Sequence, residues 1–423
     1  MGDCCSQGVD DDVDRISELP DEILNIIISK LPTKLAVKTS ILSHRWIHVY
    51  KLTYIATFIN PSTHSKTWET FINSYFQPHE APNITKFSLI YTPSYINDFH
   101  LQKSINQLST SISNVFGLSY LPSLKCLHLQ LFVFKLNSLN ELFSKCPLLE
   151  DLSFECVDSE EMSGRCEIFL PIVKSLRMKI RFLTYEGEFV INAPKLEFFT
   201  FCSEIVTPTC SLKSSPNLIE TSVNVGHSSY HHVDSLSKKA IFGFLNGART
   251  IKVLQISCHY NKNTKLLRES LVYFLENEQQ WSSIINLEQK LPMFHKLETL
   301  KLGFNYHDWI HVIPNVLANV PRLETLIFAK GIISRNYKVT RKTRIPTLPK
   351  FRLSHLKMIE VCYFGEELEE IRILKHLLDN ATVLEKLILI KAKNQRLSEG
   401  TTFVYTGDDL KAKHLDFARI VNQ

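Results

Sequence analysis

The sequence predicts an α/β protein in which a small N-terminal helical module precedes an irregular repeat solenoid, with short parallel strands on the concave face and helices outside. Three observations lead to this fold class. One phrase of the form L-x-x-L-x-L recurs eleven times between residues 84 and 389. Its last two apolar positions alternate with polar ones, as in a strand with one buried face. Residues 15–52 carry a different pattern, which is helical and very apolar.

Composition narrows the class of protein. Of 423 residues, 44% are hydrophobic and 22% charged, and no apolar run approaches the roughly 20 residues of a membrane-spanning helix, so we expect no transmembrane segment. Four aspartates between residues 10 and 14 argue against a targeting peptide and favour an intracellular protein of the nucleus or cytoplasm. The net charge of +5 is too small to indicate a nucleic-acid partner. The ten cysteines form no C-x-x-C pair, which predicts reduced thiols and argues against a zinc knuckle or a thioredoxin-like site. We expect no metal site and no cofactor.

The N-terminal module begins after a leader, residues 1–14, that we expect to be disordered. In the stretch SELPDEILNIIISKLP, Pro20 stands near a first helical turn, and Asp21 and Glu22 complement the helix dipole. This helix is expected to end near Lys30, and a second helix to begin at Pro32.

The module carries more apolar side chains than about 40 residues can bury. They are Ile23, Leu24, Ile26, Ile27, Ile28, Leu31 and Trp46. Either another protein covers them, or the module is a cap that seals the first repeat.

The repeats are expected over residues 83–350. Successive copies between Leu124 and Leu218 are 22 to 25 residues apart, within the roughly 20 to 29 residues of a leucine-rich repeat. Several copies follow a proline that ends a helical phrase, so each unit reads as a helix, a proline stop and a strand. The alternative is an ordinary α/β domain with leucine-rich strands. Helical spacing of Trp68, Phe71 and Tyr75 predicts a linking helix in residues 53–82, and residues 391–423 are expected to form a tail.

The module then shows a specific resemblance. L-P-x-E-I-L, a second L-P and S-x-R-W together resemble the F-box motif. The resemblance implies docking on a Skp-type adaptor and, through it, on a cullin-RING ubiquitin ligase. The residues that it predicts to bind the adaptor are Leu19, Pro20, Ile23, Leu24, Ile27, Leu31, Pro32, Val37, Leu42 and Trp46.

A second resemblance lies near the C-terminus. Residues 351–390 are similar to the FBD segment of plant F-box proteins with leucine-rich repeats, through L-S-H-L-K, F-x-G, E-E-L-E-E and L-L-x-N-A-x-V-L-E-K. We expect this segment to form the last repeats of the solenoid.

Polar strand positions are expected to face the concave surface, where an unknown target protein would bind. Their mixed charges suit a folded or peptide partner, although each position alone also fits a plain solvated face. The candidates are His128, Gln130, Asp151, Glu155, Arg177, Lys179, Asn224, Gln255, Lys301 and Glu360.

Three further features leave alternatives open. Residues 330–352 contain eight basic and no acidic residues, which fits an acidic segment, an inositol phosphate or a solvated insertion. The start MGDCCS fits a lipidation pattern or a disordered leader. Two histidine groups, at residues 227–232 and 307–311, have no clear third metal ligand.

No catalytic motif was found, so we expect no enzyme activity from this chain. The favoured function is the substrate-recognition subunit of an SCF-type (Skp, cullin, F-box) ligase. The alternatives are an interaction scaffold outside any ligase and a small-molecule or inositol-phosphate receptor.

Overall fold

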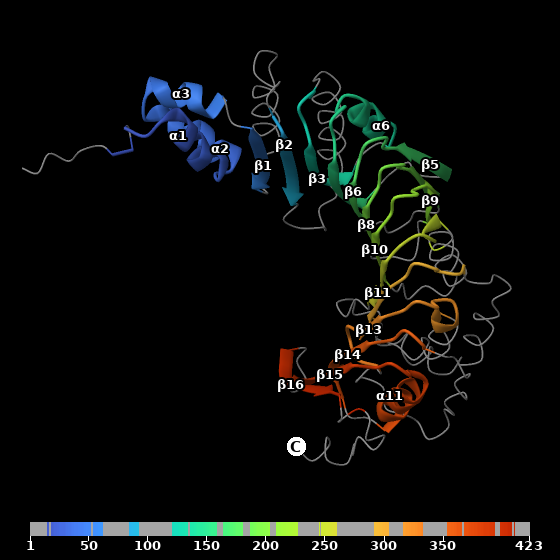
Figure 1. Ribbon diagram of the computed structural model, residues 1–423. Helices are drawn as coiled ribbons and strands as arrows, with labels where there is room; N and C mark the ends of the chain where they lie inside the picture. Colours follow the sequence, from blue (N-terminus) through green and yellow to red (C-terminus); the bar gives the residue numbers. More distant parts are fainter. Residues whose placement is uncertain are drawn as a thin grey trace, which may run out of the picture.

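A computed structural model gives the fold shown in Figure 1. One curved sheet runs through the molecule, with the N-terminal helices at one end and the C-terminal strand at the other. The structure describes residues 15–16, 18–51, 54–61, 84–92, 121–133, 136–158, 164–180, 187–203, 209–226, 245, 247–259, 292–303, 316–332, 353–365, 368–393, 398–407 and 410.

The N-terminal module folds into short helices, as the sequence predicts. They are α1 (Asp21–Ser29), α2 (Thr33–Lys38), the 3-10 helix η1 (Thr39–Ile41) and α3 (His44–Lys51). Pro20 and Pro32 directly precede α1 and α2, where a missing backbone N–H breaks no helical hydrogen bond. The module has a small core of its own, separate from that of the sheet: Leu24, Ile28, Ala36, Trp46 and Val49.

Within the described residues the main sheet has 13 strands, and eleven of them contain the eleven copies of the repeated phrase. Their pairing is parallel throughout, so neighbouring copies stack in register and each buries the apolar face of the next. In sheet order they are β2 (Lys86–Thr92), β3 (Cys126–Val133), β4 (Asp151–Asp158), β6 (Ser175–Ile180), β8 (Phe198–Ser203), β10 (Glu220–Gly226), β11 (Val253–His259), β12 (Thr299–Gly303), β13 (Thr325–Phe328), β14 (Met358–Phe364) and β15 (Lys386–Lys393).

The two remaining strands correct the predictions for residues 53–82 and 391–423. β1 (Ile55–Pro61) pairs in parallel with β2, so the predicted linking helix is wrong for this segment. Ala56 and Phe58 are buried in the main core, which stabilises an extended segment over a helix. The helical phrase at residues 67–76 lies outside the described residues. β16 (Ser398–Thr406) pairs antiparallel with β15, so the predicted tail contains the last strand of the sheet.

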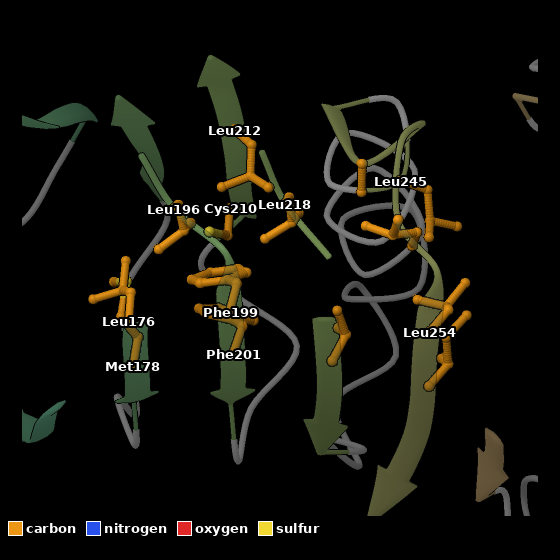
Figure 2. Packing of buried hydrophobic residues seen from close by; sticks show 14 of the residues in the cluster. Leu176, Met178, Leu196, Phe199, Phe201, Cys210, Leu212, Leu218, Leu245 and Leu254 are labelled. Atoms are coloured by element: carbon orange, nitrogen blue, oxygen red, sulfur yellow. The ribbon is translucent and has the colours of Figure 1, made fainter. Parts of the chain in front are cut away.

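The core lies on the convex side of the main sheet. Within each parallel strand of this sheet, the second and fourth positions of the register are buried, as in Leu176 and Met178 of β6 or Phe199 and Phe201 of β8. The first apolar residue of each phrase, such as Leu196, turns into the same core. Figure 2 shows this packing in the middle of the sheet.

The outer layer contains strands as well as the predicted helices. Two helices, α6 (Leu136–Ser144) and α11 (Leu368–Asn380), lie on the convex side, as expected. Between them a parallel sheet of β5 (Gly164–Phe169), β7 (Gly187–Asn192) and β9 (Thr209–Ser214) covers the core. RCEI in β5 and TCSLKS in β9 alternate polar and apolar residues with a period of two, which suits a strand better than a helix. β7 instead has three consecutive buried apolar residues, Phe189, Val190 and Ile191.

The residue just before each strand forms a ladder along the sheet. Its N–H donates to the carbonyl of the equivalent residue one repeat earlier, as from Lys174 to Glu150 at 2.8 Å. The side chains alternate in charge over part of this ladder, and ion pairs join Lys174 to Glu150 at 3.1 Å and Lys357 to Glu324 at 3.0 Å. Such exposed pairs contribute little energy each, but like charges in another register would repel.

A buried carboxylate joins two turns near the C-terminus. Glu370, on α11, is 1% exposed and accepts hydrogen bonds from the N–H groups of Ile332 at 3.0 Å and Gly365 at 2.7 Å. This arrangement fixes α11 against the strand ends of β13 and β14.

Two further findings concern the described part of the chain. Its helices are all too short or too polar to cross a membrane. Six of its cysteines are free thiols, and burial raises the pKa of Cys146 to about 12 and that of Cys166 to about 11.

Candidate functional site

The N-terminal module exposes an unusual number of large apolar side chains. Of the sixteen that are exposed in the described chain, seven belong to residues 16–42. The largest exposed fraction, 89%, is that of Ile41. Concentrated apolar surface of this kind marks an interaction site in soluble proteins. The seven are Ile16, Ile23, Ile26, Ile27, Leu35, Ile41 and Leu42.

The ten predicted adaptor-binding residues fall into three groups. Exposed ones are Pro20, Ile23, Ile27 and Leu42, and half-buried ones are Leu19, Leu31, Pro32 and Val37. The other two, Leu24 and Trp46, are only 0% and 6% exposed and belong to the core of the module. These two side chains hold the helices together, and the prediction that they form part of a contact surface needs correction. Helical spacing explains the split, because Leu24 and Ile28 share the inner face of α1 and turn Ile23 and Ile27 outward.

Sequence reasoning left four exposed apolar residues out of the predicted set: Ile16, Ile26, Leu35 and Ile41. The sequence assigns Ile26, Leu35 and Ile41 to the apolar load of the module without placing them on the contact surface. The alternation of inner and outer positions along α1 was the signal that could have identified Ile26.

Arg45 of the S-x-R-W motif has a structural role. Its guanidinium donates to Asp21 Oδ1, with Nε at 2.7 Å, and also to the carbonyl of Leu19. These bonds join α3 to the start of α1. They therefore fix the helix that carries Ile23 and Ile27.

The module is attached directly to the edge of the sheet. The backbone N–H of Thr57, in β1, donates to Thr33 Oγ1 at 2.7 Å, and Thr33 is buried at the start of α2. This satisfies a donor on the free edge of β1, and Figure 1 shows the helices beside that strand. The module thus caps the sheet through α2, as the alternative interpretation expected, while its apolar residues on α1 and η1 stay exposed.

All ten predicted target-binding residues lie at outward positions of the main sheet, alternating with buried ones. Three rows of such positions cross the strands in register. The first row contains Asp151. The middle row contains His128, Arg177, Gln255, Lys301 and Glu360. The last row contains Gln130, Glu155, Lys179 and Asn224.

The charges near β3 to β6 partly neutralise one another. Lys179 Nζ lies 2.9 Å from Glu155 Oε1, and both side chains are mostly buried. Burial lowers the pKa of His128, and the positive charges of Arg177 and Lys86 lower it further. The carboxylates of Glu155 and Asp151 act in the opposite direction without cancelling the shift. The imidazole is therefore neutral at physiological pH.

One aromatic residue on this face was missed. Phe198 occupies a first-row position on β8 and is 45% exposed. It follows Glu197 in KLEFFTF, and no other copy has an aromatic residue at this position, so that departure from the pattern could have identified it.

Several earlier predictions lie outside the described residues. These are the leader with MGDCCS, the basic segment from residue 333 to 352 and both histidine groups. Within the described ranges, no three His, Cys, Asp or Glu side chains gather in a way that would hold a metal ion.

Comparisons with known proteins agree with both resemblances. A model described as the F-box domain matches residues 16–49, and a model described as FBD matches residues 347–389. Among curated proteins of Arabidopsis thaliana, an FBD-associated F-box protein is 25% identical over 90% of this chain and 90% of its own length. An F-box/FBD/LRR-repeat protein is 26% identical over 89% and 90%. Another FBD-associated F-box protein is 30% identical over 50% of this chain and 62% of its own length.

In this chain the F-box helices come first, the stacked parallel strands follow, and the FBD covers the last repeats. Residues matched by the FBD model include β14, α11 and the start of β15, so this segment completes the solenoid. The chain therefore carries an F-box and an FBD and is similar to the F-box/FBD/LRR-repeat proteins of plants.

Proposed function

We propose that this chain is the substrate-recognition subunit of an SCF-type ubiquitin ligase, binding a Skp-type adaptor through the N-terminal module and a target protein through the concave face. F-box proteins of this kind generally serve as the substrate-binding subunits of SCF ligases, which favours a binding role over catalysis. In this role the chain brings a target close to a ubiquitin-carrying enzyme, so its contribution is proximity and orientation.

The observation that carries the proposal is the exposed apolar face formed by α1, η1 and Leu42, the residue that follows η1. Ile23, Ile27 and Leu42 are 42%, 43% and 64% exposed in a module whose core is otherwise complete. Burying an aliphatic side chain stabilises a complex by about 1.5–3 kcal/mol, so covering this face contributes to the affinity of a partner. A cap alone would need apolar residues only toward β1.

The test is co-purification of the full chain with a plant Skp-type adaptor. An Ile27→Glu, Leu42→Glu variant changes two exposed residues, so it leaves the module folded and introduces two carboxylates into the contact. Each substitution should reduce the free energy of adaptor binding by at least about 1.4 kcal/mol, so we expect the affinity for the adaptor to fall by about 100-fold or more.

A matched control places glutamate at two exposed aliphatic residues of the solenoid, Ile219 and Val383, which are 40% and 44% exposed. The Ile219→Glu, Val383→Glu variant should bind the adaptor like the wild type. Circular dichroism confirms that both variants are folded. If the folded wild type does not bind the adaptor, the module is only a cap and the chain acts as a scaffold outside any ligase.

A further inference from the structure

The centre of the concave face has a charge pattern that its edges lack. From β2 to β12 the middle row reads Ser88, His128, Ser153, Arg177, Thr200, Ser222, Gln255 and Lys301. It contains two full cations, hydroxyl and amide donors, and no carboxylate. The first row, by contrast, carries Asp151 and Glu220.

The two cations of the middle row differ from the other lysine nearby. Lys179 is paired with Glu155 at 2.9 Å. Arg177 is exposed, and within the described chain neither it nor Lys301 is ion-paired with a carboxylate. A guanidinium that no carboxylate of the described residues neutralises is available to bind a carboxylate on a partner.

An exposed aromatic residue stands beside Arg177. Phe198 begins β8, next to β6, and its register partner is Ser175, two residues before Arg177. Among the described residues at outward positions of the main-sheet strands from β2 to β15, Phe198 is the single large apolar side chain that is exposed. Aromatic residues and arginine are the types that most often dominate binding energy at an interface.

We propose that the centre of the concave face binds an extended acidic segment of the target protein, with an apolar residue of that segment packed on Phe198 and its acidic residues paired with Arg177 and Lys301. This proposal rests on the proposed function, because it names the class of target that the concave face takes.

The spacing of the strands sets the length of the segment. Arg177 and Lys301 are four strands apart, or about 19 Å at roughly 4.8 Å per strand. An extended chain covers that distance in about six residues. Asp151 and Glu220 in the first row repel acidic residues, so they direct the segment along the middle row.

The probe is a phage-displayed library of random peptides about 12 residues long, selected on the full chain, followed by binding of an enriched peptide measured by fluorescence anisotropy. We expect enriched peptides to contain Asp or Glu together with an aromatic or aliphatic residue. The Arg177→Glu, Phe198→Ala variant should bind such a peptide at least about ten-fold more weakly. Selection on Arg177→Glu alone should shift toward peptides with Lys or Arg, because the charge at that position is inverted.

The matched control makes the same changes on the convex side. Phe169, at the end of β5, is 57% exposed, and Arg372 is exposed on α11. The Arg372→Glu, Phe169→Ala variant should bind the peptide as the wild type does. The proposal is overturned if no acidic peptides are enriched, if basic peptides are, or if both double variants lose affinity equally.

Adaptor co-purification on the same preparations separates this proposal from the proposed function. If the chain selects acidic peptides but does not bind the adaptor, the peptide site is supported and the proposed ligase role is refuted. A chain that binds the adaptor without selecting such peptides keeps the ligase role and loses this site.

Discussion

Replacing Thr221 with valine should stabilise the protein. Thr221 is 0% exposed and is the second residue of β10, in the buried row that faces the core. Its register partners on the neighbouring strands are Phe199 and Leu254. Ten of the twelve residues of this buried row have large apolar side chains, and Ala56 is the other small one. Among the described residues, the hydroxyl of Thr221 has no hydrogen-bond partner.

The size of the effect follows from two terms. A buried polar group without a partner costs about 1–3 kcal/mol. Valine has nearly the same shape, so the Thr221→Val change removes the hydroxyl and leaves no cavity. We therefore expect the free energy of unfolding to rise by about 1 kcal/mol.

Urea unfolding, followed by circular dichroism, measures this change as a shift of the midpoint at constant slope. The Thr221→Ser variant keeps the hydroxyl and loses a methyl group, so it should be less stable by about 1 kcal/mol. Thr200, one strand away, faces the concave side, and Thr200→Val should change stability by less than about 0.5 kcal/mol. A destabilised Thr221→Val variant would mean that the hydroxyl is satisfied and that the reasoning fails.

Two more predictions concern charge. Lys174→Glu places a third carboxylate between Glu150 and Glu197 in the ladder, where like charges repel. The free energy of unfolding in urea should fall by about 0.5–1 kcal/mol at low salt and by much less at about 1 M NaCl, which screens the repulsion. Equal losses at both salt concentrations would contradict this. Burial lowers the pKa of His128, so the unfolded chain binds more protons below about pH 6.5, and stability falls as pH drops through that range. Between about pH 7.5 and about pH 5.5, the free energy of unfolding of the His128→Gln variant should fall less than that of the wild type. An equal fall in both proteins would mean that other groups cause the pH dependence.

The repeated strands were predictable because their pattern is strong and local. All eleven copies of the phrase contain a strand of the main sheet, even where insertions separate them by up to 46 residues. β1 was not predicted because its phrase has small residues at two of the three apolar positions, Thr53 and Ala56, whereas no other copy has more than one, Thr221. Its strand is nevertheless stabilised by Phe58, which packs against Phe87 of β2 with ring centroids 5.7 Å apart.

The outer layer was less predictable. A helix and a strand can both cover the same apolar face, and the choice depends on short segments such as GRCEIF and GEFVIN. Each is only six residues long, and three such segments are stable because they pair with one another in β5, β7 and β9. That cooperation between units cannot be read from any single unit.

The functional surface of the module was predictable as a segment but not residue by residue. A motif identifies positions such as Leu24 and Trp46 without saying whether they face a partner or the core. Burial separates the two roles, because Ile23 and Ile27 alternate with Leu24 and Ile28 around one short helix. Tests of adaptor binding therefore need the outer set, since replacing Trp46 would remove core packing and weaken binding through unfolding.

The way the module joins the sheet bears on how the proposed ligase would work. The bond from Thr57 to Thr33 attaches α2 to β1, and parallel pairing continues without a break from β1 to β8. Phe198 on β8 is therefore five strand steps, or about 24 Å, from the strand that holds the module. Since hydrogen-bonded strands keep their spacing, a target bound at the centre of the concave face would be held at a fixed distance and angle from the adaptor. Orientation of that kind is what a non-catalytic subunit can contribute to transfer of ubiquitin.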